Sequence, residues 1–423
     1  MRFGTHVVRH RPFGVPMIGN VSNGYAIGLT EEGARLCDRL FAEEVSEAEI
    51  AEVSGDLLAH LKRGGFAEET REPGEEASAP RETDAAPGAL ASAYLHVTHH
   101  CNLRCVGCYS GVDDRNARVD LPLETLAAMV RRLAAAGVQR LVISGGEPFL
   151  RADLPAIAQC AKETGIGFVD VLTNGTCVGD DALAALAPWA DQVAVSFDGV
   201  SGASVPHIRR EPLYDMLTDT VRRIREAGIA AHIIPTLHAL NIDDAARYCA
   251  LADELGATVN FSLLSAPSDS AEVAAALPDE EAQAHLARTL LALGSTRPVA
   301  VADTPVSTGL CTTVGCGAGC SMVSVSADGD VYPCHMLHND AFKVGSLVED
   351  DACLRQRRPP ACAVEGLPAC TDCEIRYLCG GGCRARAFFA TGDVRARDPY
   401  CALMKTYYQL LFQAMVGSDE ERR

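Results

Sequence analysis

The sequence lacks the features that would tie the protein to a membrane. No apolar run reaches the roughly eighteen residues that a spanning helix needs. The longest charge-free run, residues 304–327, contains Pro305 and many Gly, Ser, Thr and Cys residues. The N-terminus carries Arg2, Arg9 and Arg11 and has no apolar stretch like that of a secretory signal. We therefore expect a protein that works in the cytoplasm without a membrane partner.

Basic residues are scarce as well. The chain of 423 residues has 37 Lys and Arg against 56 Asp and Glu, a formal net charge of -19. Because phosphate surfaces demand clustered positive charge, this balance argues against a nucleic-acid partner or an anionic membrane. With 48% hydrophobic and 22% charged residues, the composition is that of a globular protein, and the length suggests about three folded units.

Cysteine, by contrast, is abundant. The chain has 18 cysteines, which is too sparse at this length for the disulfide scaffold of a small secreted domain. Three of them lie within residues 101–108, and most of the others lie after residue 300. Clustered cysteines at short spacings in a reducing compartment favour metal binding.

Residues 1–69 are expected to form a small winged-helix-like unit with one strand pair and three helices. Asn23-Gly24 suits a tight turn between the two strands, and Thr30 and Ser46 suit helix N-caps. Residues 70–91 are rich in Glu, Pro, Ala, Ser and Gly, a composition typical of a solvated linker.

Residues 92–302 alternate between strand and helix patterns. Such β/α repeats predict an α/β fold with a parallel sheet, curled into a partial (β/α)6 TIM-like barrel, whose functional residues lie at the C-terminal ends of the strands. The expected strands cover residues 94–98, 140–144, 167–173, 192–197, 229–236 and 258–264. Residues 303–423 form a Cys- and Gly-rich region of short segments with little periodicity. We expect that such a region cannot build a conventional hydrophobic core and that metal clusters hold it together, before a last helix that begins near Cys401.

The first chemical motif is Cys101-Asn-Leu-Arg-Cys105-Val-Gly-Cys108, just after the first strand of the barrel. Three thiolates at these spacings can bind one iron–sulfur cluster and leave its fourth iron without a protein ligand. A structural zinc site is the alternative, with His99 or His100 as the fourth ligand.

This spacing resembles that of the radical S-adenosylmethionine (SAM) superfamily, and further strand-end residues match the same pattern. The resemblance implies a 4Fe–4S cluster at the three catalytic cysteines and SAM bound to its open iron. The residues implied to contact SAM are Tyr109, Gly145, Gly146, Glu147, Asn174, Ser196, Asp198 and Arg209. Among these, Glu147 would balance the SAM ammonium as an otherwise unpaired carboxylate. Gly107 stands where the family often has an aromatic residue, so adenine contacts would fall mainly to the backbone, with Tyr109 as a candidate side chain.

The cysteines after residue 300 resemble the SPASM extension of radical SAM enzymes that modify peptides. This likeness implies two auxiliary 4Fe–4S clusters, the nearer one at Cys316, Cys334 and Cys383. Cys311 is the best fourth ligand, and Cys320 is its competitor. The outer cluster is implied to bind Cys370, Cys373, Cys379 and Cys401. A pair of zinc knuckles is the chemical alternative. Among the other cysteines, Cys37, Cys160 and Cys249 fall on apolar helix faces, whereas Cys353 and Cys362 fall in a loop-like stretch.

The implied function is a radical SAM peptide maturase. A 5′-deoxyadenosyl radical would abstract hydrogen from a ribosomally made precursor peptide, leading to a thioether or C–C cross-link or a related change. Residues 1–69 resemble a leader-peptide recognition domain, and a flavodoxin or ferredoxin would supply electrons. The alternatives are an anaerobic sulfatase-maturing enzyme, a dehydrogenase of a small alcohol, and a non-catalytic zinc-binding interaction protein. His335 counts against the sulfatase-maturing type, which carries an acidic residue at that position.

Overall fold

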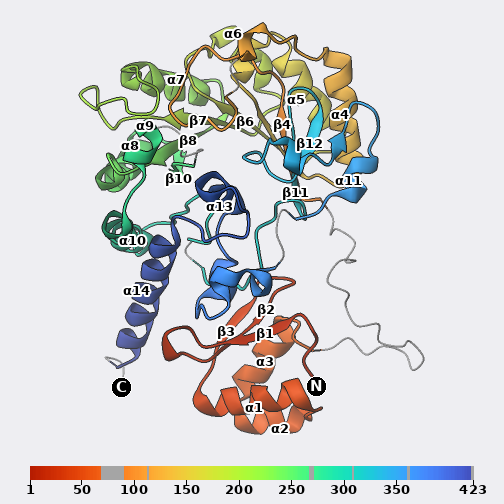
Figure 1. The fold of residues 1–423 in the computed structure, drawn as a ribbon, viewed down its shortest axis with the longest axis vertical. Helices are drawn as coiled ribbons and strands as arrows, with labels where there is room; N and C mark the ends of the chain where they lie inside the picture. The colour runs from red at the N-terminus through yellow and green to blue at the C-terminus, as the bar shows by residue number, and fades with distance from the viewer. Residues whose placement is uncertain (68–89, 112–113, 266–270, 307–308, 360–362, 421–423) are drawn as a thin grey trace.

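The computed structural model describes residues 1–67, 90–111, 114–265, 271–306, 309–359 and 363–420. The N-terminal unit lies at one end of the molecule, the large sheet at the other, and the Cys-rich region between them (Figure 1). None of the helices in the described ranges is long and apolar enough to cross a membrane.

The N-terminal unit contains a three-stranded antiparallel sheet and three helices. Its elements are β1 (Val7–His10), β2 (Met17–Asn20), β3 (Ala26–Gly28), α1 (Glu31–Ala42), α2 (Glu47–Val53) and α3 (Gly55–Arg63). The predicted strand pair and helices are confirmed, and the side chains of Thr30 and Ser46 accept hydrogen bonds from the backbone N–H groups of Gly33 and Glu49. The first strand was not expected. The strand order is β1-β2-β3, so β3 is an edge strand.

Within the described residues, the large sheet has ten strands. They are β4 (Ser92–His96), β5 (Arg140–Ser144), β6 (Phe168–Thr173), β7 (Gln192–Phe197), β8 (Ala230–Leu237), β9 (Thr258–Val259), β10 (Ser262–Leu263), β11 (Met322–Val325), β12 (Asp330–Tyr332) and β13 (Gly345–Ser346). The main path runs β10-β8-β7-β6-β5-β4-β11-β12-β13, and β9 pairs with β8. The strands from β4 to β10 pair in parallel, as predicted, so their C-terminal ends meet at one edge of the sheet.

Helices follow the outside of the curved sheet (Figure 1). Those between its strands are α4 (Leu123–Ala135), α5 (Leu154–Glu163), α6 (Asp180–Leu186), α7 (Tyr214–Glu226) and α8 (Ala245–Leu255). The later helices are α9 (Ala271–Ala276), α10 (Glu280–Gly294), α11 (Ala352–Gln356), α12 (Arg376–Cys379), α13 (Arg384–Thr391) and α14 (Cys401–Glu420). As expected from their periodicity, α1, α5 and α8 carry Cys37, Cys160 and Cys249 toward the core.

The Cys-rich region contains regular strands that contribute to the main hydrophobic core, which its sequence does not suggest. Its strand β11 extends the barrel sheet by pairing in parallel with β4, with Val325 opposite Leu95. Val323, Val325 and Val331 are fully buried in the main core. The expectation that this region cannot build a hydrophobic core is therefore wrong, because it borrows an edge of the barrel. Cys353 is likewise a buried residue of α11 and not part of a loop, whereas Cys362 lies outside the described residues.

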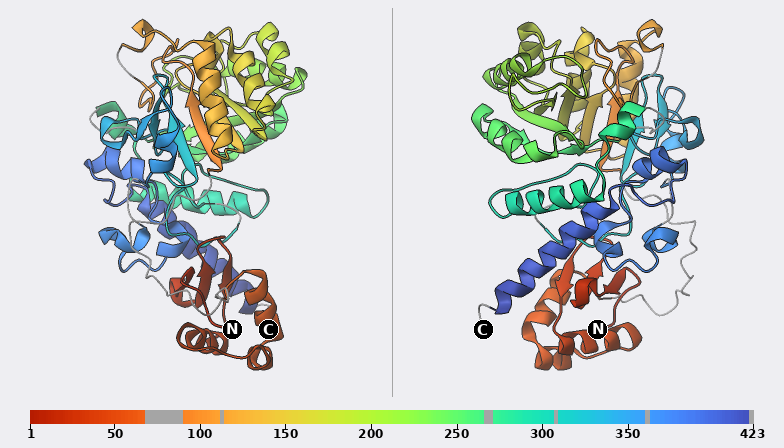
Figure 2. Two further views of the ribbon diagram at one scale, coloured as in Figure 1. Left: turned by 90° about the vertical axis from the view of Figure 1, so that its right-hand side faces the viewer. Right: turned by 60° about the vertical axis from the view of Figure 1, so that its left-hand side comes forward.

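The N-terminal unit packs against the Cys-rich region (Figure 2). The Thr312 N–H donates to the Gly24 carbonyl at 2.9 Å, and the Phe13 N–H donates to Glu374 Oε2 at 2.9 Å. The His10 ring meets the Tyr377 ring edge-on at 5.7 Å. Apart from its last two residues, the predicted linker lies outside the described residues.

Candidate functional site

The loop with the first three cysteines follows β4 and is anchored from two other segments. The Cys101 N–H donates to Asn116 Oδ1 at 3.0 Å, and Asn116 Nδ2 donates back to the Cys101 carbonyl at 3.1 Å. The Val106 N–H donates to the Ile208 carbonyl at 2.8 Å. These bonds fix the loop at the C-terminal edge of the sheet, where the parallel topology predicts functional residues.

The three thiols of this loop share one region. Burial raises the pKa of Cys105 to about 11, the Arg209 guanidinium opposes this rise, and Cys108 and Cys101 add to it. Burial also raises the pKa of Cys101, whose Sγ accepts a weak hydrogen bond from Asn174 Nδ2 at 3.7 Å. Buried thiols of this kind lose their protons when a cation replaces them, which suits metal ligands.

Gly145 and Gly146 are needed for the close approach of two backbones. Gly145 has a φ of 136°, and a Cβ there would lie 2.5 Å from the Thr98 carbonyl oxygen. A Cβ on Gly146 would lie 2.2 Å from the His100 carbonyl oxygen. The Gly146 N–H donates to the Thr98 carbonyl at 2.8 Å. These glycines therefore position the segment that leads directly into Cys101.

Glu147 differs from the sequence-based expectation. Its side chain is fully buried and accepts three hydrogen bonds, from Thr173 Oγ1 at 2.7 Å, the Asn174 N–H at 2.7 Å and the Phe149 N–H at 3.0 Å. The expectation of an unpaired carboxylate is therefore wrong. Burial raises the pKa of Glu147, and the same hydrogen bonds act against the rise. The carboxylate joins the C-terminal ends of β5 and β6.

Asn174 and Asp198 also make protein contacts. Asn174 Nδ2 donates to Asn102 Oδ1 at 2.9 Å, which links the end of β6 to the cysteine loop. Asp198 Oδ2, after β7, accepts from the Ile208 and Arg209 N–H groups at 3.1 Å each.

Arg209 differs from these residues, because part of its side chain lacks a hydrogen-bond partner among the described residues. Its side chain is buried, and its Nε has no hydrogen-bond partner within the described part of the chain. Its positive charge acts to lower the pKa of both Cys105 and Glu147, against the rise that burial causes. Ser196, near the end of β7, is half-buried beside the same edge of the sheet. A buried guanidinium with an orphaned donor fits an anionic group such as the carboxylate of SAM.

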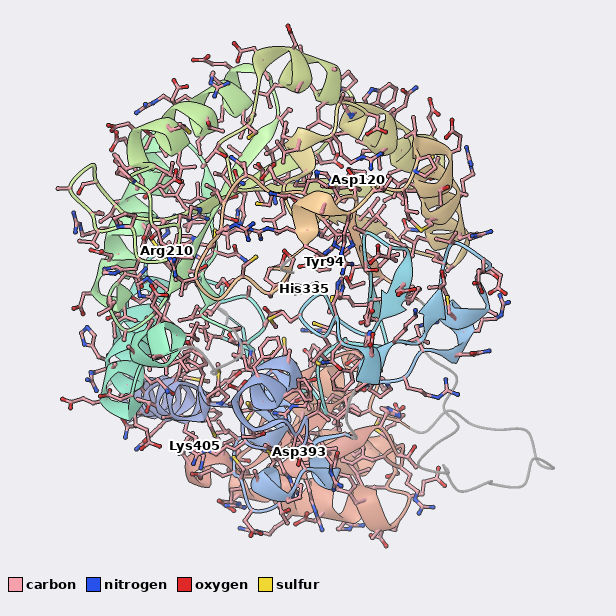
Figure 3. All side chains as sticks on the ribbon, turned by 45° about the horizontal axis from the view of Figure 1, so that its top comes forward. Tyr94, Asp120, Arg210, His335, Asp393 and Lys405 are labelled. Atoms are coloured by element: carbon pink, nitrogen blue, oxygen red, sulfur yellow. The ribbon has the colours of Figure 1, made fainter. Side chains whose placement is uncertain are left out.

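Tyr109 lies in a group of aromatic rings between the barrel and the Cys-rich region. Its ring meets the His335 ring edge-on at 5.2 Å. His335 in turn stacks on Tyr94 of β4 at 4.2 Å, and these two residues lie side by side in Figure 3. Burial raises the pKa of Tyr109 to about 12. The ring thus connects the first cysteine loop with the loop that follows Cys334.

The Cys-rich region encloses a cavity of about 330 Å³. Cys316, Cys334 and Cys383, expected together from the sequence, all line it, and so does Cys379. Neither candidate for the fourth ligand lines it. Cys311 is exposed and lies beside Gly24 of the N-terminal unit, whereas the Cys320 carbonyl accepts a hydrogen bond from Arg357 Nε.

The four outer cysteines also lie near one another. Burial raises the pKa of Cys379 to about 12, with further contributions from Asp398 and from Cys401, Cys370 and Cys373. Within the described ranges, no group of three His, Cys, Asp or Glu side chains is arranged to hold a metal ion directly. Thiol groups gathered around two adjoining places are nevertheless the donor set that iron–sulfur clusters take.

Sequence reasoning missed the polar contacts that hold these thiols. Arg386 and Asp398 form an ion pair at 3.0 Å, with side chains only 1% and 3% exposed. Asp398 Oδ2 also accepts from the Cys383 N–H at 2.6 Å, and Asp398 Oδ1 from the Tyr400 N–H at 2.9 Å. The pair thereby connects the loop of Cys383 to the start of α14. No local pattern in the sequence marks these two residues.

Comparison with known families agrees with this geometry. Residues 95–252, from β4 through most of α8, match the family model of the radical SAM superfamily. These residues of the chain therefore form a radical SAM domain.

Two curated relatives show how far the similarity extends. The chain is 29% identical over 376 residues to a PqqA peptide cyclase of Ruegeria pomeroyi, covering 82% of this chain and 96% of that protein. It is 29% identical over 332 residues to the mycofactocin maturase MftC of Mycolicibacterium smegmatis, covering 72% of this chain and 81% of that protein.

Solved structures share the fold. The chain superimposes on native anSMEcpe with bound AdoMet with a TM-score of 0.62 at 16% identity, covering 79% of this chain and 100% of that one. It superimposes on Streptococcus suis SuiB, bound to its precursor peptide SuiA, with a TM-score of 0.58 at 14% identity. This second match covers 94% of this chain and 98% of that one, so it includes the N-terminal unit.

Proposed function

We propose that the protein is a radical SAM peptide maturase that modifies a ribosomally made precursor peptide in the cytoplasm. The proposed domains are a winged-helix-like leader-recognition domain at 1–69, a linker at 70–91, the radical SAM barrel at 92–302 and a SPASM domain at 303–423. The names of the relatives, a peptide cyclase and a maturase, support a peptide substrate.

The observation that carries the peptide assignment is a groove in the N-terminal unit. A hollow of about 570 Å³ lies along β3 and is closed on its other side by residues of α1 and α3. Its lining mixes apolar side chains such as Ile27 and Leu57 with the polar rim residues Glu32 and Asp56. An edge strand beside a helix suits β-augmentation by an extended peptide.

The register identifies which groups of β3 are free to pair. The Asn20 N–H donates to the Tyr25 carbonyl at 2.8 Å, and the Leu29 N–H donates to the Pro16 carbonyl at 2.8 Å. Because hydrogen-bonded pairs alternate along an antiparallel ladder, Ile27 bonds inward to Ile18. The outward N–H groups are therefore those of the two flanking residues, Ala26 and Gly28.

In the barrel, a cluster at the first three cysteines would supply the reductive cleavage of SAM to a 5′-deoxyadenosyl radical. Cys101, Cys105 and Cys108 would bind that cluster, and Arg209 would hold the SAM carboxylate. Asn174 and Ser196 would orient the nucleoside at the strand ends, with Tyr109 beside the adenine. Asp198 and Glu147 would act by positioning other residues, because their carboxylates accept hydrogen bonds from the backbone N–H groups of Arg209 and Asn174.

The auxiliary sites would serve electron transfer or substrate binding. Cys316, Cys334 and Cys383 would bind the nearer cluster, and the outer four cysteines the second. A flavodoxin or ferredoxin is the proposed electron donor. The product would be a peptide with a thioether or C–C cross-link or a related change.

Replacing Ala26 by Pro tests the peptide assignment. Pro removes the outward N–H of this edge position and leaves the Ile18–Ile27 pair intact. Coexpressed with the precursor peptide encoded beside its gene, Ala26→Pro should modify several-fold less peptide by mass spectrometry than Ala26→Val, which keeps the N–H. Both variants should make 5′-deoxyadenosine without peptide as the parent does. Equal modification by the two variants would refute recognition at β3 and favour a small-molecule substrate.

A further inference from the structure

Arg115 lies on a short helical turn that follows the loop with the first three cysteines. Two sets of hydrogen bonds join this turn to the loop. Arg115 Nη2 donates to the carbonyl oxygen of Leu103, which lies midway between the first two cysteines in the sequence. The next residue, Asn116, exchanges two hydrogen bonds with the Cys101 backbone. The guanidinium is therefore held against the middle of the cysteine loop.

The Arg115 side chain is buried, yet it has no acidic partner among the described residues. The residue is 3% exposed, and its Nε has no hydrogen-bond partner within the described ranges. The adjacent Asp114 pairs instead with Arg118, at 2.9 Å. Because a charge removed from water is costly unless an opposite charge lies beside it, a guanidinium in this position calls for an anionic neighbour.

Arg209, the other buried guanidinium of the site, reaches this region from a different segment. It follows β7 and is proposed above to hold the carboxylate of SAM. Arg115 by contrast binds the cysteine loop itself, and the proposed contacts with SAM do not involve it. Its charge is therefore available to act on the group that the loop would hold.

Three thiolates give a 4Fe–4S cluster a net negative charge, which becomes larger when the cluster accepts an electron. A fixed positive charge nearby favours that reduced state, and the effect is strong where water is excluded. Charge and hydrogen bonding around a cluster are among the features that set its reduction potential. We propose that Arg115 raises the reduction potential of the SAM-binding cluster and so favours its reduction by the electron donor. This inference rests on the proposed function, which includes that cluster.

The test compares the full-length parent protein with three variants. Arg115→Gln keeps a side-chain donor for the Leu103 carbonyl but removes the charge, whereas Arg115→Lys keeps the charge. Arg118→Gln is the matched control, because this arginine of the same segment is 34% exposed and already pairs with Asp114 and Asp328. Circular dichroism and the content of iron and sulfide check that each variant is folded and loaded.

The measured quantity is the midpoint potential, followed by electron paramagnetic resonance during a redox titration. The signal of the SAM-binding cluster is the one that changes when SAM is added. Arg115→Gln should lower its potential by about 59 mV, a tenfold loss in the equilibrium constant for one-electron reduction. Arg115→Lys and Arg118→Gln should stay near the parent value. Signals that do not respond to SAM should keep their potentials in every variant.

Two results would overturn the inference while leaving the proposed function intact. One is an equal potential in the parent and in Arg115→Gln. The other is an equal fall in Arg115→Lys, because the guanidinium would then act through its hydrogen bonds and not through its charge.

Two further outcomes are also decisive. If Arg115→Gln fails to take up the cluster, iron uptake becomes the readout. Arg115→Lys should then load as the parent does, and failure of both variants would assign Arg115 to folding alone. If no signal of the parent responds to SAM, the SAM-binding cluster of the proposed function fails, and the role of Arg115 fails with it.

Discussion

The barrel and the Cys-rich region both contain clustered thiols, yet different interactions stabilise the two regions. In the barrel, buried aliphatic strands and amphipathic helices form a continuous core that positions the Cys101 loop. In the Cys-rich region, short segments depend on a borrowed sheet edge and on the buried Arg386–Asp398 pair. The fold of the barrel can be predicted from local sequence periodicity, whereas that of the Cys-rich region depends on contacts between segments far apart in the sequence.

The largest expected effect separates the iron of the two regions. Changing Cys101, Cys105 and Cys108 together to Ala should abolish 5′-deoxyadenosine formation, because these thiols hold the proposed SAM-binding cluster. Iron should fall from about twelve to about eight per chain, since the auxiliary sites keep theirs. Chromatography and iron analysis measure both quantities.

Two results would contradict this separation. Persistent 5′-deoxyadenosine in the triple variant would remove these cysteines from catalysis. A wild-type iron content near four per chain would leave the Cys-rich region without its proposed clusters.

A second experiment weakens the Cys-rich region alone. Arg386→Gln leaves the Asp398 carboxylate buried without its cation, which costs about 3–5 kcal/mol in comparable sites. The unfolding midpoint should fall, and auxiliary iron should be lost before the barrel iron, because Asp398 also holds the Cys383 backbone. Thermal unfolding followed by circular dichroism gives the midpoint. The double variant that combines Arg386→Leu with Asp398→Asn is the control, and it should recover part of the loss if the stranded charge is the cause.

A third experiment acts on the barrel. Glu147→Gln replaces one of the two acceptor oxygens with an NH2 donor. Whichever oxygen position the Gln nitrogen takes, it meets a backbone N–H group, that of Asn174 or that of Phe149. One unsatisfied buried group costs roughly 1–3 kcal/mol. Since Asn174 contacts the cysteine loop, SAM affinity should fall about tenfold, equivalent to about 1.4 kcal/mol. Equilibrium binding measures it, with exposed Glu226→Gln as the control. Unchanged affinity would mean that Glu147 serves stability alone.

The same contrast explains how much the sequence could predict. The strands 140–144 and 192–197 match β5 and β7 residue for residue, because each is a short run of mostly buried residues between polar turns. β11 was missed, since its partner β4 lies more than two hundred residues earlier in the chain. The spacing of Cys316, Cys334 and Cys383 predicted that they lie together, and they line one cavity. A carboxylate such as Asp398 carries no spacing signal, and its contact with the Cys383 backbone is recognised only in the fold.

The smallest expected effect lies at the joint between the N-terminal unit and the Cys-rich region. Burial, with a lesser contribution from Arg376, lowers the pKa of His10 from 6.5 to about 4. Neither ring nitrogen of His10 has a hydrogen-bond partner among the described residues, and the ring packs against Tyr377. The folded protein therefore keeps this imidazole neutral, whereas the unfolded chain protonates it below about pH 6.5.

The contribution of this contact to the free energy of unfolding is therefore fully present above pH 6.5. It is lost as the pH falls toward 4, because the unfolded state then binds a proton that the folded state does not. His10→Phe keeps an aromatic ring against Tyr377 and removes the titrating group. Between pH 7 and pH 5, the unfolding midpoint of the parent should fall by more than that of His10→Phe, and the difference isolates His10 from any acid-labile iron that both proteins share. The exposed His285→Phe should follow the parent. If His10→Phe and the parent lose stability in parallel, the imidazole is solvated in solution, and the N-terminal unit is attached less closely than its contacts with Tyr377 and Glu374 indicate.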